Sequence, residues 1–116
     1  MEPIFDRHGR AVGWLSNDVV YERSGHARAF VDNGAVISYR AQHIGWLDGC
    51  YFRDRSGDAV GFMSGATAGP LPPVPDVLPV PPVLTIAPVP PVPPVAPPPP
   101  GPALNWSNLD WEHYLG

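Results

Sequence analysis

A sixteen-residue repeat constrains the fold of this chain more than any other feature of its sequence. Four aromatic residues follow one another at intervals of sixteen residues: Trp14, Phe30, Trp46 and Phe62. Each is preceded by Gly or Ala and followed by Leu, Val or Met, and the four copies align from Pro3 to Ala66 without a gap. The first 66 residues must therefore be built from four equivalent pieces.

Each copy is typical of a β-hairpin. Residues 6–9, 22–25 and 54–57 share an acidic residue, an Arg, a small or polar residue and a Gly. The acid accepts backbone hydrogen bonds, and Gly supplies the positive φ that closes a type I turn with a bulge. The third copy has Ser38-Tyr39-Arg40-Ala41 at this place, so we expect a different turn type there. The short β-branched and aromatic runs between turns predict an all-β domain of about eight strands.

Alternation of side chains assigns the faces of the strands. It places Ala11, Gly13 and Leu15 on one face of the second strand, and Val12 and Trp14 on the other. Small residues repeated in every copy indicate backbones crowded toward a shared axis, as in the narrow part of a small barrel. Closure would also remove exposed edge strands. The four repeated aromatics would then form a ring that is either core or an accessible apolar cup.

The repeated Asp-Arg-x-Gly-x-Ala-Val-Gly-aromatic pattern resembles the four-fold β-flower family, as do the Gly-Pro-Leu-Pro-Pro-Val-Pro segment at 69–75 and the Trp-rich end. The resemblance covers the whole chain. It implies four β-hairpins closed in a shallow, square barrel, and it brings no catalytic residues. That barrel is loosely similar to the phospholipid-binding Tubby-like fold, which makes lipid contact a candidate by analogy of fold.

The prolines divide the chain into three parts. Of 18 prolines, 17 lie between Pro70 and Pro102, which separates a β head (1–66), a proline-rich segment (67–102) and a tail (103–116). Every third residue from 71 to 95 is aliphatic, and because polyproline II has three residues per turn these positions form one stripe: Leu71, Val74, Val77, Val80, Val83, Ile86, Val89, Val92 and Val95. The polar residues Asp76 and Thr85 lie on another stripe.

A polyproline II helix of this length spans roughly 75 Å, which is longer than a head of this size is wide. Two interpretations follow. The stripe packs along another surface, which would be a second copy, a partner protein or a membrane. Alternatively, the segment is a semi-rigid spacer whose period remains from tandem duplication.

The tail carries the signals of a short helix. Ser107 and Asp110 are spaced as a helix N-cap and its third residue, and a helix to Leu115 would be too short to persist alone in water. Its large apolar residues therefore predict anchors that fold upon docking, either in cis or in trans: Trp106, Leu109, Trp111, Tyr114 and Leu115.

Composition argues against several classes of function. All seven cationic residues are Arg and the formal net charge is −4, so the basic footprint of nucleic-acid binding is missing. The four histidines and Cys50 lack metal-ligand spacing, and we find no phosphate loop or nucleophile elbow. We expect no catalytic residue, metal or cofactor. Without a visible signal peptide or membrane-length apolar run, we expect a cytoplasmic location.

The sequence therefore favours a non-enzymatic interaction or assembly module, with a rigid β head, a semi-rigid proline-rich spacer and a C-terminal Trp anchor. Its partner would be another protein or a second copy. The alternative is a lipid- or membrane-associated module that uses the aromatic cup or the Trp residues.

Overall fold

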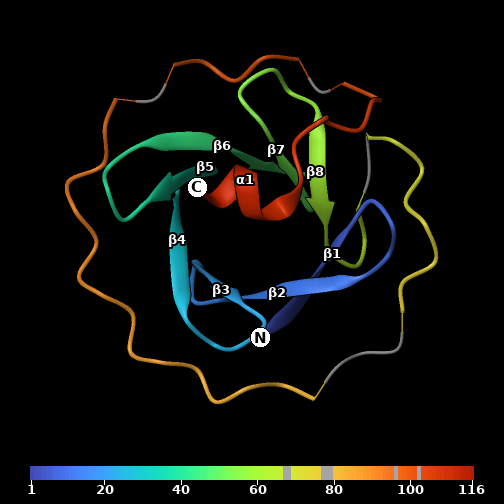
Figure 1. Ribbon diagram of the computed structural model, residues 1–116. Helices are drawn as coiled ribbons and strands as arrows, with labels where there is room; N and C mark the ends of the chain where they lie inside the picture. Colours follow the sequence, from blue (N-terminus) through green and yellow to red (C-terminus); the bar gives the residue numbers. More distant parts are fainter. Residues whose placement is uncertain (67–68, 77–79, 96, 102) are drawn as a thin grey trace.

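The computed structural model is a closed barrel of eight antiparallel strands with one short helix at its end (Figure 1). It describes residues 1–66, 69–76, 80–95, 97–101 and 103–116. The elements are β1 (Glu2–Asp6), β2 (Ala11–Ser16), β3 (Val19–Glu22), β4 (Ala27–Asp32), β5 (Ala35–Ser38), β6 (His43–Asp48), β7 (Tyr51–Arg53), β8 (Ala59–Phe62) and α1 (Trp111–Leu115). Each strand pairs with its sequence neighbours, and β1 pairs with β8 to close the ring. The predicted all-β barrel of four hairpins is confirmed.

The Gly closes the turn as predicted in three hairpins, and the acid accepts turn N–H groups as predicted in the first and fourth, whereas Glu22 accepts from the side chains of Ser24 and Arg28. In the first copy, the side chain of Asp6 accepts from the backbone N–H groups of His8 and Arg10, over 2.9 and 3.1 Å. The N–H of Gly9, whose φ is +81°, donates to the carbonyl of Asp6. The turns of the second and fourth copies have the same backbone bonds and positive φ at their Gly.

The third turn was expected to differ, and that prediction is wrong. The N–H of Ala41 donates to the Ser38 carbonyl, and the hydroxyl of Ser38 accepts from the N–H groups of Arg40 and Gln42 at 3.3 Å each. Ala41 takes a φ of +60°. A serine hydroxyl therefore replaces the carboxylate, and an alanine tolerates the left-handed conformation at a cost of about 1 to 2 kcal/mol.

The simple alternation of faces is also wrong at one position in each copy. The pairing register shifts in all four hairpins, so that Val12 and its equivalents form a β-bulge. Because a bulge adds one residue, it reverses the side chains beyond it. Ala11 and Ala59 therefore pack with Phe62, whereas Val12 and Val60 pack toward the central cluster.

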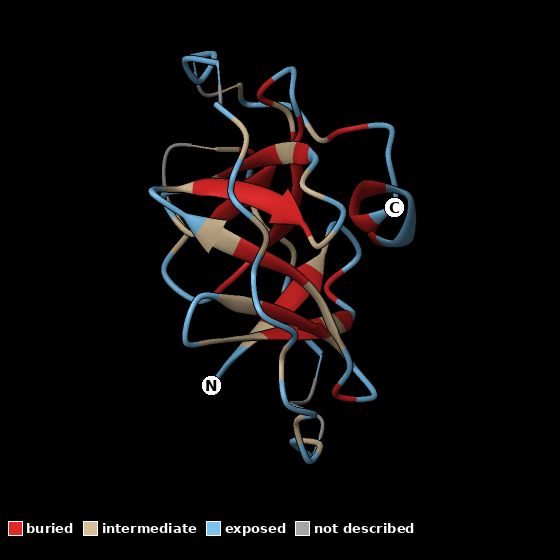
Figure 2. Cartoon of the chain, turned by 90° about the vertical axis from the view of Figure 1, so that its left-hand side faces the viewer, coloured by how far each residue is buried: buried red, intermediate tan, exposed pale blue. Residues whose placement is uncertain are grey.

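The inside of the barrel is filled by side chains from the strands and from α1. Ile4, Val20, Val36 and Phe52 are fully buried there. Further members come from α1: Trp111, Tyr114 and Leu115. Figure 2 shows the helix capping one end of the barrel, where the hairpin turns also lie.

The proline-rich segment does not extend away from the head as the spacer interpretation expected. It runs around the outside of the barrel and returns to β8, so that the last residues reach the barrel mouth (Figures 1 and 2). We call residues 69–103 the belt, within the described ranges given above. The molecule measures 35 × 34 × 21 Å, which is a thick disc with the belt at its circumference.

Candidate interaction surface

The belt is fastened to the hairpin turns by backbone hydrogen bonds. The N–H of Asp76 donates to the Gly9 carbonyl over 2.9 Å, and the N–H of Thr85 donates to the Gly25 carbonyl over 3.0 Å. The N–H of Ala103 reaches the Gly57 carbonyl over 3.4 Å. We call each such meeting of the belt with a hairpin turn a station. The backbone N–H groups of Asp76 and Thr85, and the hydroxyl of Thr85, thus point to the barrel.

The positions of the stations reveal a nine-residue repeat in the belt, in addition to its three-residue repeat. The turn residues Gly9, Gly25, Ala41 and Gly57 are sixteen apart, whereas the belt residues 76, 85, 94 and 103 are nine apart. Pro-Pro-Val recurs at 72–74, 81–83 and 90–92 with the same spacing. A nine-residue self-comparison of the sequence would have found this repeat. One belt unit therefore matches one hairpin.

Glycine lets the belt approach the turns closely. A Cβ on Gly9 would lie 2.5 Å from the carbonyl oxygen of Val74, and one on Gly25 would lie 2.5 Å from that of Val83. A Cβ on Gly57 would meet the carbonyl oxygen of Gly101 at 2.9 Å. Real Cβ atoms do not come so close, so three of the turns need Gly both for their φ and for the belt.

The four repeated aromatics lie under the belt, on the outer wall of the barrel. Trp14, Phe30, Trp46 and Phe62 are all buried, with at most 9% of the residue exposed. Phe30 and Trp46 belong to one outer cluster and Phe62 to another, both separate from the cluster that contains α1. The ring is therefore buried but separate from the central cluster: belt residues lie beside Phe30 and Trp46, and Trp106 lies beside Phe62.

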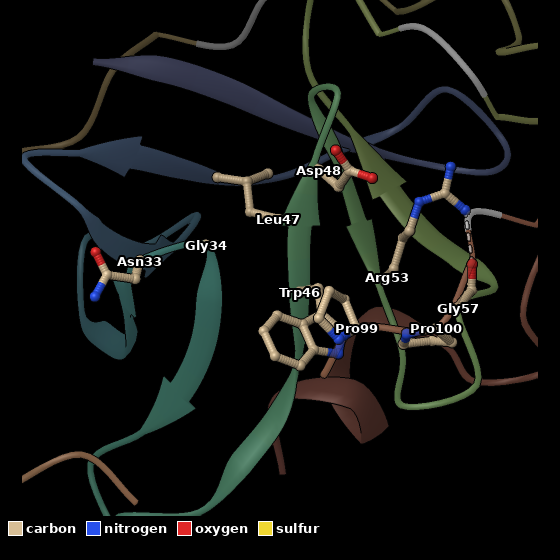
Figure 3. A pocket seen from close by; sticks show the side chains of 9 residues that line it. All are labelled: Asn33, Gly34, Trp46, Leu47, Asp48, Arg53, Gly57, Pro99 and Pro100. Atoms are coloured by element: carbon tan, nitrogen blue, oxygen red, sulfur yellow. Dashed lines mark hydrogen bonds between the residues drawn. The ribbon is translucent and has the colours of Figure 1, made fainter. Parts of the chain in front are cut away.

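Two equivalent grooves form between the belt and this wall. One, of about 290 Å³, lies between Trp46 and the pair Pro99 and Pro100 (Figure 3). The other, of about 470 Å³, lies between Phe30 and the pair Pro90 and Pro91. Phe30 comes sixteen residues before Trp46 in the barrel, and Pro90 comes nine residues before Pro99 in the belt. Both grooves are thus products of the paired repeats.

The aliphatic stripe faces away from the barrel. Eight of its nine predicted residues are 88–99% exposed: Leu71, Val74, Val80, Val83, Ile86, Val89, Val92 and Val95. We call these eight residues the apolar rim. Val77, the ninth, lies outside the described residues. Within the described part of the chain, no segment covers the rim.

The tail docks on its own barrel, and its anchors separate into two groups. Trp111, Tyr114 and Leu115 are 3–4% exposed inside the barrel mouth. Trp106 lies on the outer wall, where its ring meets those of Tyr51 and Phe62 at 6.1 and 6.2 Å. Leu109 is 44% exposed, so it does not anchor the tail on its own barrel.

The glycines that precede the aromatics make room for the helix. A Cβ on Gly61 would lie 3.0 Å from the ring of Trp111, and one on Gly45 would lie 2.6 Å from the hydroxyl of Tyr114. That hydroxyl donates to the carbonyl of Arg53 over 2.9 Å. Complete burial raises the pKa of Tyr114, so this hydroxyl stays protonated and remains a donor.

The helix begins later than predicted. Asp110, and not Ser107, is the N-cap, and its carboxylate accepts from the N–H of His113 over 2.8 Å. The hydroxyl of Ser107 instead donates to the carboxylate of Asp54 over 2.6 Å, and both residues are buried. The same hydroxyl accepts from the N–H of Leu109 over 3.1 Å, so Ser107 closes a turn before the helix and also joins that turn to the fourth hairpin.

The third hairpin holds polar groups that the other copies lack. Tyr39 and His43 occupy the positions of Arg7 and Ala11 in the first copy. The hydroxyl of Tyr39 and the Nε2 of His43 are buried and have no hydrogen-bond partner among the described residues. Burial, and to a lesser extent the charge of Arg55, lowers the pKa of His43. His43 is therefore neutral at pH 7.

Chemistry of an enzyme or metal site is not evident in the described ranges. No group of three or more His, Cys, Asp or Glu residues there could hold a metal ion. In the same ranges, no helix is long and apolar enough to cross a membrane. Cys50 is a free, half-buried thiol between β6 and β7.

Comparison with known proteins gives one match. A family model described as 4-fold beta flower protein matches residues 2–115, which is nearly the whole chain. Neither the curated proteins nor the solved structures contain a match. The match includes the belt and the tail as well as the barrel.

Proposed function

We propose that this chain, which belongs to the 4-fold beta flower family, is a non-enzymatic interaction module whose apolar rim binds an apolar surface of a partner protein or of a second copy. One observation carries the proposal: eight large aliphatic residues along the described parts of the belt are almost fully exposed. Contiguous exposed apolar surface on a folded protein marks an interaction site.

The attachment of the belt supports this function. A free proline-rich strand loses conformational freedom when it binds, whereas the belt is already ordered by its stations at Gly9, Gly25 and Gly57. The barrel therefore presents the rim in a fixed arrangement. The role given to the proline-rich segment changes accordingly, from a spacer between head and anchor to the presenting surface itself.

The position of the rim sets how a partner can meet it. The rim follows the circumference of a disc about 35 Å across (Figure 1). A flat surface would touch only a few rim residues, and a concave surface would touch more. We infer that tight binding needs a concave partner, and that contacts between rims of two copies are weak because they bury little area.

A triple variant tests the proposal. Val83→Asn, Ile86→Asn and Val89→Asn together remove the centre of the rim without touching the barrel. We expect unchanged thermal unfolding and a loss of concentration-dependent association in sedimentation velocity, or of an identified partner in affinity capture. Leu109→Asn is the matched control, since Leu109 is exposed but lies outside the belt. Equal association of the triple variant and the wild type would refute the proposal.

Lipid contact is the second candidate, and the same exposed rim is the observation that favours it. The aromatic ring and the Trp residues are buried or half-buried, so a lipid-binding module would have to use the rim. Flotation with neutral phosphatidylcholine vesicles tests this. Flotation of the wild type and not of the triple variant would support lipid, whereas no flotation would leave the protein partner as the function.

A further inference from the structure

We propose that the outer wall of the barrel is a receptor for extended proline-rich strands, and that the belt beside the third hairpin turn can be exchanged for such a strand from a partner protein. The spacings of sixteen residues in the barrel and nine in the belt pair this turn, at Ala41, with Pro94, and we call this pair the third station. This inference concerns the inner side of the belt and is independent of the rim. Its occupant has a stated chemistry: a Pro-Pro-Val strand with a free backbone N–H two residues after the Val.

The contacts between the wall and the belt use backbone N–H groups and prolines, which any proline-rich strand of this kind also has. An extended proline-rich chain makes no internal hydrogen bonds, so its remaining N–H groups are free to donate outward. At two stations, the N–H two residues after Pro-Pro-Val donates to a turn carbonyl at 2.9–3.0 Å. Pro-Pro pairs of the belt line the grooves beside the aromatic wall, as Pro90 and Pro91 do opposite Phe30.

The third station departs from the others on both sides. Its belt residue is Pro94, which has no N–H to donate. Its turn residue is Ala41, whose Cβ stands where a Cβ on Gly9 or Gly25 would crowd the belt carbonyl. The chain's own belt therefore fits this station least well. Between Thr85 and Ala103, no belt backbone N–H donates to the barrel in the described residues.

The wall beneath this stretch offers unused hydrogen-bonding groups. The hydroxyl of Tyr39 and the Nε2 of His43 have no partner among the described residues, and His43 is only 9% exposed. Tyr39 packs against Phe30, and His43 packs edge-on against Trp46. Burying a polar group without a hydrogen-bond partner destabilises the fold. A strand that supplied donors or acceptors here would recover part of that lost stability.

The chain itself contains the best model for the incoming strand. Thr85, within residues 81–89, donates to the Gly25 carbonyl from its N–H and from its hydroxyl, over 3.0 Å each. A strand of this sequence class would place an N–H and a hydroxyl at the carbonyl of Ala41. The belt on either side would stay fastened at Gly25 and Gly57, so exchange needs only local lifting of the segment between them.

Titration of the intact protein with a synthetic peptide of residues 81–89 tests the proposal. We expect saturable binding by calorimetry together with a change in Trp fluorescence. Loss of most of the fluorescence change in a Trp46→Phe variant, which places at this position the residue found in copies two and four, would assign the signal to this part of the wall. A peptide with Pro in place of Thr85 should bind about tenfold more weakly, since it lacks the station N–H.

The variant Pro94→Thr supplies the missing donor in cis. It should raise the stability of the protein and weaken binding of the 81–89 peptide about tenfold, because the chain's own belt then competes better. Three results would each overturn the proposal: no saturable binding up to millimolar peptide, equal binding of the Thr85 and Pro peptides, or equal affinity in Pro94→Thr and wild type. Rim variants at Val83, Ile86 and Val89 should leave peptide binding unchanged, which separates this test from that of the rim.

Discussion

Thr85 donates two hydrogen bonds to the carbonyl of Gly25, one from its backbone N–H and one from its hydroxyl, each over 3.0 Å. This contact joins the belt to the second hairpin, 60 residues away in the sequence. The turn glycine serves both partners, because its φ of +96° closes the turn and its missing side chain admits the belt.

Replacement of this glycine should cost more than backbone strain alone. We expect Gly25→Ala to lower the free energy of unfolding by about 2 to 4 kcal/mol, from the left-handed φ and the displaced belt contact together. Gly65→Ala is the matched control, since Gly65 has a φ of +84° with nothing within 4 Å of its Cβ position. It should cost only about 1 to 2 kcal/mol. Urea unfolding measures both, and equal losses would contradict the role of the belt.

The third turn offers the reverse test. Ala41→Gly should stabilise the protein by about 1 kcal/mol, because the relief of strain at a φ of +60° exceeds the entropy that glycine adds to the unfolded chain. Ala35→Gly, in a buried strand, should instead destabilise it. A decrease in melting temperature for Ala41→Gly would show that the turn is not strained.

Within the tail, the helix in the barrel mouth should contribute most to the free energy of unfolding. Trp111→Ala removes a buried ring that meets Phe52 edge-on at 5.3 Å, and we expect a loss of about 3 to 5 kcal/mol. Tyr114→Phe should cost about 1 to 3 kcal/mol, because it leaves the buried carbonyl of Arg53 without this donor. Leu109→Ala, at an exposed site, should change stability by less than about 0.5 kcal/mol. Chemical denaturation that ranks these three differently would contradict the docked tail.

His43 should make stability depend on pH. Its pKa is lowered in the folded state by burial and by Arg55, so the unfolded chain binds a proton more readily than the native one. The stabilising contribution is present above the unfolded value of about 6.5 and is lost as the pH falls toward the folded pKa. His43→Ala restores the residue found in the other three copies and should flatten the stability profile between about pH 5 and 7. An unchanged slope in that variant would assign the pH dependence to another group.

The barrel could be predicted because its information is local and repeated. The turn at Asp6–Gly9 and its equivalents fix the hairpins, and four copies without a gap require closure. The bulge at Val12 could not be predicted, because it depends on how paired strands bend and not on the pattern of apolar residues in either one. The third turn was misjudged since Ser38 and Ala41 differ in chemistry from Asp and Gly but make the same bonds.

The three-residue period alone could not predict that the belt runs around the barrel. That period correctly separated Asp76 and Thr85 from the aliphatic stripe, but it said nothing about which side meets the barrel. The register with the hairpins is carried by the period of nine, which becomes visible when Asp76 is compared with Thr85 and Ala103. The N-cap at Asp110 was missed because Ser107 binds Asp54, a residue distant in sequence.

The correspondence of nine belt residues to sixteen barrel residues limits how this protein can change during evolution. Duplication of a hairpin would lengthen the path that the belt must cover, and the existing belt would then fall short of Gly57 and leave the helix outside the barrel mouth. Gain or loss of a unit in one part therefore requires the same change in the other, at a distance in sequence of 46 residues (103 − 57) to 67 residues (76 − 9). Single residues can differ between stations, as Ala41 and Pro94 do, but the number of hairpins and the number of nine-residue belt units must change together.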